Sequence, residues 1–375
     1  MAELVALDLP AGPGYVDALR AVWDAGDAAL PVDPRLPRPA AERLLATLRP
    51  AAFVTVDGRT ALADGLPVEP GDALVVATSG TTGEPKGVIH THASVTASAV
   101  LTSAGLAVDP HRDRWVACLP LAHIGGLSVV MRSLVTGTPC TVLERFDPAT
   151  VEEEARRGAT LVSLVATALG RCDASGYRSV LLGGAAPPVG LPDNVVTTYG
   201  MTETGSGCVY DGRPLDGVEL RIGDGTLGAA GEILVRGPML LRAYRDGSDP
   251  RLPGGWLATG DGGHLEEDGT LVVHGRMAEV IVTGAEKVWP TQVEDVLARH
   301  PAIAEVAVWK RPDPEWGERV VAWVVPTPGS TAPALGELRE LVGAELARWA
   351  APRELVVVDA LPRTAGGKVQ RSELS

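Results

Sequence analysis

The sequence Thr-Ser-Gly-Thr-Thr-Gly-Glu-Pro-Lys-Gly-Val occupies residues 78–88, directly after the apolar run 73–77. Glycine permits backbone conformations closed to other residues, so several N–H groups of such a loop can converge on one anion. The hydroxyl side chains add donors, and Lys86 adds a positive charge. The pattern therefore predicts a phosphate-binding loop after a short strand. The residues that carry this prediction are Ser79, Gly80, Thr81, Thr82, Gly83, Lys86 and Gly87.

This loop differs from that of the P-loop NTPases, in which a serine or threonine follows the lysine and holds magnesium. Here Gly87 and Val88 follow Lys86, and neither carries a hydroxyl. Any nucleotide chemistry must therefore be of another kind. Taken alone, the segment is more typical of a Thr/Gly-rich surface hairpin, so the rest of the sequence has to decide between the two interpretations.

The composition favours a two-domain protein that binds small molecules. A chain of 375 residues exceeds the usual size of one domain. The formal net charge is −14 and no basic cluster exceeds a few residues, which argues against binding to nucleic acid or to anionic membranes. The sequence assigns no oligomeric state.

The cysteines and the N-terminus indicate a reducing, cytoplasmic setting. Cys118, Cys140, Cys172 and Cys208 are widely spaced and form no Cys-x-x-Cys pair, so neither a zinc site nor a disulfide framework is predicted. The first ten residues have acidic side chains and no basic start, which is unlike a signal peptide. No uncharged apolar stretch is long enough to cross a bilayer, so an integral membrane protein is not expected.

Helices that alternate with strands predict an α/β fold. Apolar residues recur at helical spacing over 14–25 and 40–48, whereas 51–56 and 73–77 read as short buried strands. Continued alternation predicts a large N-terminal domain of layered α/β subdomains. After Tyr210 the sequence changes to short strands punctuated by glycine and aspartate, which predicts a β-rich subdomain.

A small α+β domain is predicted at the C-terminal end. After Arg276 the expected elements are strand 280–283, helix 291–299, strands 305–310 and 319–325, and helix 335–348. They form a lobe of about a hundred residues, in keeping with the size of small domains. We therefore expect two domains, at residues 1–276 and 277–375.

Two further segments have the character of ligand-binding loops. Residues 182–187, Leu-Gly-Gly-Ala-Ala-Pro, follow an apolar strand, and their glycines let the backbone lie flat against a ring. Residues 199–205, Tyr-Gly-Met-Thr-Glu-Thr-Gly, place an aromatic ring, hydroxyls and a carboxylate at a strand exit. Open α/β sheets bind ligands at the carboxyl ends of their strands.

Three more segments nearer the C-terminus carry suitable side chains. Residues 258–262 read as a loop that offers the Asp261 carboxylate to the hydroxyls of a ribose. Arg276 follows Gly275 and offers a guanidinium. Lys368 stands beside two glycines within residues 361–371, where it could reach far.

In this order, these segments resemble those of the adenylate-forming superfamily, which includes acyl-CoA synthetases, peptide-synthetase adenylation domains and luciferases. The resemblance extends from about Leu30, where Pro-Val-Asp-Pro-Arg-Leu-Pro is similar to a family motif, to Arg371. It implies that ATP and an acid bind to the large domain and that the small domain is mobile. It also implies a two-step reaction in which a carboxylate attacks the α-phosphate of ATP and a thiol then displaces AMP.

The resemblance implies roles residue by residue. The β- and γ-phosphates of ATP would contact Thr78, Ser79, Gly80, Thr81, Thr82, Gly83 and Lys86. The adenine would lie against Gly183, Gly184, Ala185, Tyr199, Gly200 and Met201. Thr202 would bind the α-phosphate, and Glu203 would hold Mg²⁺. Asp261 and Arg276 would take the ribose hydroxyls, and Lys368 would bridge the α-phosphate and the attacking carboxylate.

The sequence departs from the family pattern near the domain boundary. The hinge position, usually Asp or Lys, falls on Ala278, which puts the energetics of the hinge in question. The next loop is often Ser-Gly-Gly-Glu but reads Thr283-Gly-Ala-Glu286 here. The extra methyl group narrows the space in which a pantetheine arm would lie. Neither change removes a catalytic group.

Residues 119–133 and 198–212 resemble the o-succinylbenzoate:CoA ligases of menaquinone synthesis, in their short actinobacterial form. This acid keeps a second carboxylate on its ring, and a buried charge of that kind requires a cation or several hydrogen bonds. Arg132 is the predicted cation, with a structural arginine paired to an acid as the alternative. His123 is expected at the pocket entrance, with a satisfied core histidine as the alternative. The other predicted pocket residues are Ser128, Thr204, Gly205 and Ser206.

Two other functions stay open from the sequence. Another acyl- or aryl-CoA ligase, or a stand-alone adenylation enzyme that loads a carrier protein, would use the same nucleotide residues. A nucleotide-binding scaffold without activity would be expected to lack Lys368 or Glu203, and both are present. The implied small molecules are ATP, Mg²⁺, CoA and a carboxylic acid.

Overall fold

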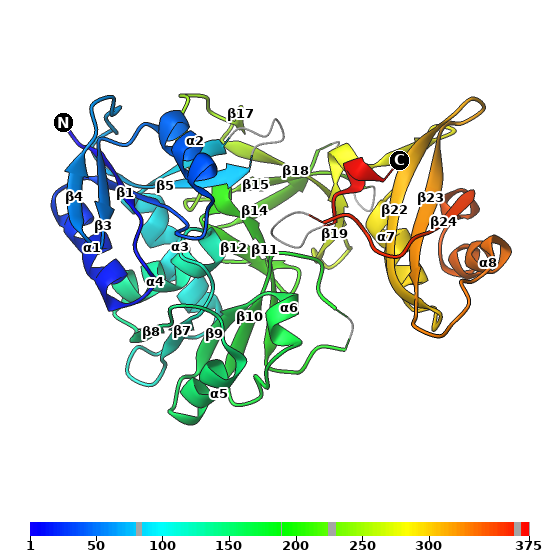
Figure 1. Cartoon of the computed structure of the whole chain (residues 1–375), viewed down its shortest axis with the longest axis horizontal. Coiled ribbons are helices and arrows are strands. Elements are labelled where there is room, and N and C mark those ends of the chain that lie inside the picture. Colours follow the sequence, from blue (N-terminus) through cyan, green and yellow to red (C-terminus); the bar gives the residue numbers. More distant parts are fainter. Residues whose placement is uncertain (80–84, 189, 224–229, 364–368, 375) are drawn as a thin grey trace. The chain divides into compact units, whose positions relative to one another are not determined.

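The computed structural model describes residues 1–79, 85–188, 190–223, 230–363 and 369–374 (Figure 1). The chain forms two compact units. The first comprises Met1–Leu220 and Leu234–Ala258, and the second comprises Arg221–Ile233 and Thr259–Ser375. Residues 259–276 thus group with the C-terminal part of the chain. The predicted domain boundary between residues 276 and 277 stays a prediction.

A seven-stranded sheet opens the first unit, with the strand order β16-β6-β5-β2-β1-β3-β4. Its strands are β1 (Leu4–Leu7), β2 (Ala28–Pro31), β3 (Ala52–Thr55), β4 (Gly58–Ala61), β5 (Asp72–Ser79), β6 (Pro85–Thr91) and β16 (Ala243–Tyr244). The helices α1 (Pro13–Asp24) and α2 (Arg38–Leu48) connect the first strands. β1 and β2 pair in parallel and are buried at every residue, as is usual for strands covered on both faces.

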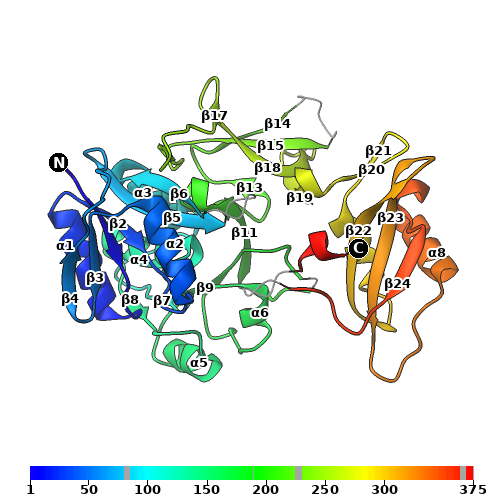
Figure 2. The same ribbon diagram turned by 45° about the horizontal axis from the view of Figure 1, so that its top comes forward.

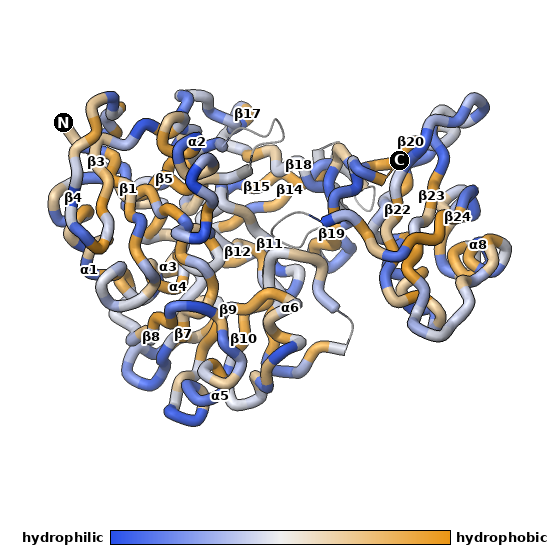
Figure 3. Tube along the Cα trace, viewed as in Figure 1, coloured by the Kyte–Doolittle hydropathy of each residue, from blue (hydrophilic) through white to orange (hydrophobic). Residues whose placement is uncertain are grey.

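A second seven-stranded sheet of the same unit has the order β13-β12-β11-β10-β9-β7-β8. Its strands are β7 (Trp115–Ala117), β8 (Cys140–Val142), β9 (Leu161–Leu164), β10 (Ser179–Leu182), β11 (Val195–Met201), β12 (Ser206–Tyr210) and β13 (Arg213–Pro214). The intervening helices are α3 (His92–Gly105), α4 (Ile124–Thr136), α5 (Pro148–Arg156) and α6 (Ala166–Leu169). β9 and β10 are among the hydrophobic segments of Figure 3, and they are buried throughout.

The predicted β-rich region is a five-stranded sheet through which the division into units passes. Its strands are β14 (Glu219–Ile222), β15 (Gly231–Arg236), β17 (Arg251–Leu252), β18 (Trp256–Leu265) and β19 (Leu271–Arg276). Asp268-Gly269 lies in the turn between β18 and β19, as expected. The prediction of a loop at 258–262 was wrong, because these residues lie inside β18. Its glycines have packing roles there: a Cβ at Gly262 would lie 1.9 Å from the Trp289 ring.

The C-terminal part has its own sheet, in the order β21-β20-β23-β22, with β24 paired to β23. Its elements are β20 (Ile281–Thr283), β21 (Glu286–Val288), α7 (Pro290–Leu297), β22 (Ile303–Asp313), β23 (Gly317–Pro326), α8 (Leu335–Glu345) and β24 (Glu354–Val357). Figures 1 and 2 show α8 beside β23 and β24. Leu338 and Val342 of α8 join the apolar core of this lobe. The fold is therefore α/β with a C-terminal α+β lobe, as predicted.

No helix in the part of the chain that the structure describes is both long enough and apolar enough to traverse a membrane.

Candidate active site

The predicted phosphate loop connects two paired strands. β5 ends at Ser79 and β6 begins at Pro85, and Thr78 stands opposite Lys86 in the antiparallel register. The predicted contacts at Gly80, Thr81, Thr82 and Gly83 lie outside the described residues. Gly87 has a packing reason of its own, since a Cβ there would lie 2.8 Å from the Leu48 and Val75 side chains.

Lys86 and Glu203 are brought together by Tyr244, a residue that the sequence analysis did not identify. The Lys86 ammonium lies 5.3 Å from the centroid of the Tyr244 ring. The Tyr244 hydroxyl donates a hydrogen bond of 2.9 Å to Oε1 of Glu203. Burial and the Glu203 charge raise the pKa of Tyr244, so this hydroxyl keeps its proton. Only pairing of β16 with β6 brings Tyr244 here, and no motif marks it in the sequence.

His90 contacts the backbone of the turn Thr202–Thr204, which carries Glu203. Nε2 of His90 lies 2.7 Å from the Thr202 carbonyl oxygen, and Nδ1 lies 3.2 Å from the Ser94 hydroxyl. Burial lowers the pKa of His90 to about 4, so the ring is neutral near pH 7 and Nε2–H donates to the carbonyl. His90 therefore positions the turn by a neutral hydrogen bond.

Thr204 closes the same turn. Its hydroxyl lies 2.6 Å from the Ser206 carbonyl and 2.9 Å from that of Met201, and it accepts a hydrogen bond from the Met201 N–H. Gly205 follows with φ 68°, a conformation that favours glycine. In this arrangement the hydroxyl of Thr204 shapes the turn, and its predicted contact with the acid stays a prediction.

The predicted adenine residues lie at the ends of two adjacent parallel strands, β10 and β11. Gly183 lies against Thr198, so that a Cβ would be 2.6 Å from the Thr198 hydroxyl oxygen. Gly184 has φ 87° and is exposed, as is Ala185. On β11, a Cβ at Gly200 would lie 2.2 Å from the Ser206 carbonyl oxygen. Both glycines therefore allow close packing against neighbouring chain, and the predicted contact of this region with adenine stays a prediction.

Arg132 is the most unusual charge of the first unit. It lies on α4 with only 3% of its surface exposed, and Nη2 donates a hydrogen bond of 2.5 Å to the Ser206 hydroxyl. Nε and Nη1 are buried without a hydrogen-bond partner, and no carboxylate among the described residues pairs with the guanidinium. The alternative of a structural arginine paired to an acid is therefore wrong for this part of the chain.

Two more predicted pocket residues lie on or next to α4. Ser128 is buried one turn before Arg132, and its hydroxyl lies 3.4 Å from the Gly125 carbonyl. His123 precedes α4 as its N-cap residue and is exposed, so it is not a satisfied core histidine. His123 contributes to lowering the pKa of Asp33, although the main cause is a hydrogen bond from Arg35. The Pro-Val-Asp-Pro segment therefore lies within electrostatic reach of His123.

In the second unit, the predicted ribose residues face each other across a strand pair. Asp261 on β18 stands opposite Arg276 on β19 in the antiparallel register. Nε of Arg276 lies 3.1 Å from Oδ1 of Asp261, and Nη1 donates to the Thr259 carbonyl at 3.3 Å. The carboxylate is mostly buried, whereas more than half of the guanidinium is exposed.

Lys368 lies outside the described residues, but Arg371 close behind it is well anchored. Its guanidinium pairs with Glu279 and with Glu294, each at 2.7 Å. Glu279 follows the predicted hinge residue Ala278, which is exposed in a short 3₁₀ turn. The C-terminal segment is thereby tied to the residues next to the predicted hinge.

The alanine that replaces the second glycine of the family's Ser-Gly-Gly-Glu loop, Ala285, has a strained backbone conformation. Gly284 and Ala285 both have positive φ, 60° and 70°, in the turn between β20 and β21. An alanine costs about 1–2 kcal/mol in this region of backbone space. The Trp316 ring packs over Gly284, where a Cβ would lie 2.6 Å from it.

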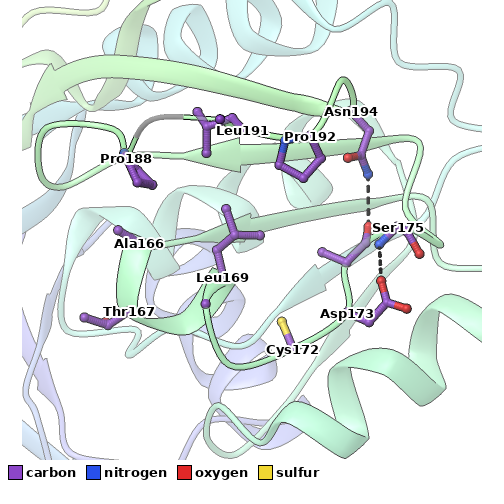
Figure 4. Close-up of a pocket in the computed structure, with 13 residues that line it drawn as sticks. Ala166, Thr167, Leu169, Cys172, Asp173, Ser175, Pro188, Leu191, Pro192 and Asn194 are labelled. Carbon is purple, nitrogen blue, oxygen red and sulfur yellow. Dashed lines mark hydrogen bonds between the residues drawn. The ribbon is translucent and has the colours of Figure 1, made fainter. Parts of the chain in front are cut away.

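A separate cavity of about 590 Å³ contains none of the predicted residues (Figure 4). It is lined mainly by apolar side chains, among them Ala166, Leu169, Leu191 and Pro192. Parallel strands are usually joined through a helix. The described part of the connection 183–194 between β10 and β11 has none, which leaves this hollow beside α6. The Asn194 amide at its rim is satisfied by the Ala174 and Tyr177 carbonyls.

Comparison with known protein families agrees with this geometry. The family model described as AMP-binding enzyme matches residues 2–245, and the model described as AMP-binding enzyme C-terminal domain matches residues 292–368. The chain belongs to the AMP-binding enzyme family.

Similar proteins narrow the comparison. The probable 2-succinylbenzoate–CoA ligase of Mycobacterium tuberculosis (strain CDC 1551 / Oshkosh) is 39% identical over 365 residues, which cover 90% of this chain and 93% of the relative. The solved o-succinylbenzoate CoA synthetase of Bacillus subtilis, in complex with the acyl-adenylate intermediate, superposes with a TM-score of 0.85 at 30% identity. That match covers 99% of this chain and 88% of the other. The same synthetase has been solved with ATP and a magnesium ion, and that structure matches with a TM-score of 0.83.

Proposed function

We propose that this chain is an ATP-dependent acid–CoA ligase that acts on o-succinylbenzoate. In the first step, the succinyl carboxylate attacks the α-phosphate of ATP, and pyrophosphate leaves with the electron pair of the broken P–O bond. In the second step, the thiol of CoA attacks the acyl-adenylate, and AMP leaves. The 2-succinylbenzoate–CoA ligases among the relatives support this assignment.

The Lys86, Tyr244 and Glu203 cluster is suited to the first step. The nucleophile is already ionised, so no general base is required, and the difficulty is to stabilise negative charge that builds up on oxygen. Lys86 would stabilise the departing pyrophosphate. Among the described residues, no group of three His, Cys, Asp or Glu side chains could hold a metal. Glu203, which accepts a hydrogen bond from Tyr244 at one oxygen, would hold Mg²⁺, and the ion would offset negative charge on the phosphates.

The second unit would supply the remaining nucleotide contacts. Asp261 would offer a mostly buried carboxylate to two ribose hydroxyls, and the more exposed Arg276 guanidinium pairs with it. Lys368 would bridge the α-phosphate and the attacking carboxylate. We propose that residues 277–375 rotate about Ala278 between the two steps, so that Lys368 withdraws before the thiol arrives.

The choice of acid rests on one observation, the buried Arg132 without a carboxylate partner in the described part of the chain. Burial of an isolated charge is costly in free energy. A bound ligand of opposite charge offsets that cost. o-Succinylbenzoate carries that second charge on its ring. A simple benzoate or fatty acid would leave Arg132 unpaired, so the site should disfavour both.

A ligase for another acid, or an enzyme that loads a carrier protein, remains the alternative because it would share every nucleotide contact. We expect the enzyme to act in the cytoplasm, where ATP and CoA are available. The acid is tested by ATP–pyrophosphate exchange across a panel of carboxylic acids, followed by detection of the CoA thioester. Exchange with o-succinylbenzoate and formation of its thioester are expected. The assignment fails if this acid gives no exchange while a benzoate or fatty acid does.

A further inference from the structure

Trp115 lies against Arg132 although it belongs to none of the sequence motifs. It begins β7, has no exposed surface and is among the largest fully buried side chains. Cζ of Arg132 lies 5.3 Å from the centroid of its ring. β7 and α4 pack against each other, which brings the two side chains together from separate elements.

The ring helps to keep the arginine charged in a dry environment. Burial lowers the pKa of Arg132, but a guanidinium stays protonated in proteins. Among the described residues, the hydrogen bonding of its guanidinium is limited to the bond to Ser206. A cation over an indole face gains about 2 kcal/mol when both are desolvated. Trp115 is thus the main aromatic support of this charge.

The pair also presents hydrogen-bond donors that nothing in the described protein uses. Nε and Nη1 of Arg132 are buried and have no hydrogen-bond partner among the described residues, and the same is true of Nε1 of Trp115. A buried N–H without an acceptor is destabilising, so a ligand that supplies an acceptor is favoured there. A carboxylate has two oxygens and can accept several hydrogen bonds.

We propose that Trp115 is a positioning residue that holds Arg132 for the second carboxylate of the acid, and thereby sets selectivity for a dicarboxylate. This inference rests on the proposed function. It predicts that the aromatic face of Trp115 matters for acids with a ring carboxylate and not for those without one. Tyr210 also interacts electrostatically with Arg132, but its hydroxyl donates to Thr102, and its effect on the pKa of Arg132 is smaller than that of burial.

The test compares o-succinylbenzoate with 4-oxo-4-phenylbutanoate, which has the same skeleton without the ring carboxylate. The ratio of kcat/KM for the two acids is measured by ATP–pyrophosphate exchange for the wild type, Trp115→Leu and Trp115→Phe. Trp115→Leu should reduce the ratio about thirtyfold, mainly through KM for o-succinylbenzoate, because about 2 kcal/mol of support is removed. Trp115→Phe keeps a weaker aromatic face and should reduce it only about threefold.

Trp323→Leu is the matched control, since Trp323 is also buried and lies 5.1 Å from an arginine, Arg311, but in the C-terminal lobe. It should leave the ratio unchanged. The inference is overturned if both Trp115 variants keep the wild-type ratio, or if they weaken both acids equally, as a merely structural residue would. A wild type without preference between the two acids would instead overturn the proposed acid. If Trp115→Leu does not fold, Trp115→Phe against Trp323→Leu decides.

Discussion

Two regions of the first unit differ in how their charged side chains are paired and exposed. At Glu203, charges of both signs lie together in a partly exposed place, where Tyr244 contacts both the Lys86 ammonium and the carboxylate. At Arg132, one positive charge is buried and has no carboxylate partner in the part of the chain described. The first region suits a reaction that is the same for every acid, and the second suits the choice of acid. Changes in one should therefore leave the other intact.

The largest effect is expected from Glu203→Gln. Loss of the charge that would hold Mg²⁺ should slow ATP–pyrophosphate exchange roughly 10²- to 10³-fold. The slowing should be the same for o-succinylbenzoate and 4-oxo-4-phenylbutanoate. Glu267→Gln, at an exposed carboxylate on the β18–β19 turn, is the control and should have no effect. A loss confined to one acid would break the separation between the two regions.

The next effect is a loss of the protein's folding stability at low pH, which His90 causes. Its folded pKa of about 4 lies below the ordinary value of 6.5, so the unfolded chain binds a proton that the folded chain does not. Stability is therefore full above pH 6.5 and falls as the pH drops towards 4, by on the order of 3 kcal/mol. His90→Gln keeps a donor to the Thr202 carbonyl but does not titrate.

The comparison is made by urea unfolding of the wild type and His90→Gln between pH 7 and pH 4.5. The difference in unfolding free energy between the two proteins should shift in favour of the variant as the pH falls. Parallel curves over the whole range would show that His90 is not buried as a neutral ring.

A smaller effect is expected from Arg132→Met, and it is an increase in the stability of the ligand-free protein. The variant removes a buried charge that pairs with no carboxylate in the described part of the chain, and it puts an apolar side chain of similar length in its place. The ligand-free protein should become more stable by about 2 kcal/mol, since such replacements are often neutral to stabilising. Thermal unfolding without ligand measures this, with Arg132→Lys as the control that keeps the charge and should gain nothing. A strongly destabilised Arg132→Met would mean that the charge is already balanced.

The smallest effect is expected from Tyr244→Phe. It removes one hydrogen bond to a charged group but keeps the ring beneath Lys86, so kcat should fall about tenfold or less. The fall should again be equal for both acids. Exchange rates with and without excess Mg²⁺ provide the measurement, and a shift in the preferred acid would contradict the proposed division of labour.

Much of this arrangement could be predicted from the sequence because local patterns decide it. Apolar runs of strand length gave the parallel strands, and Asp268-Gly269 gave the β18–β19 turn. Glycines that look like loop residues were less informative: Gly262 lies inside a strand, where its missing Cβ admits the Trp289 ring. A contact that depends on a distant partner cannot be read from spacing along the chain.

The candidate site shows the same limit. Glu203 stands in a dense motif and could be found, whereas Tyr244 reaches it only because the two-residue strand β16 adds to the edge of β6. Arg132 could be singled out by its charge on an apolar helix. That no carboxylate of the described residues pairs with it is a property of the packed interior. Trp115 gives no sequence signal, because a tryptophan at a strand start is ordinary core material.

The central claim is that the charge of Arg132 selects the second carboxylate, and one kinetic comparison tests it directly. ATP–pyrophosphate exchange is measured for the wild type and Arg132→Met with o-succinylbenzoate and with 4-oxo-4-phenylbutanoate. Arg132→Met should lower kcat/KM for o-succinylbenzoate roughly 10²-fold, because a buried carboxylate loses its cation. The same substitution should leave kcat/KM for 4-oxo-4-phenylbutanoate within about threefold of the wild type. An equal loss with both acids, or no loss with either, would contradict the account.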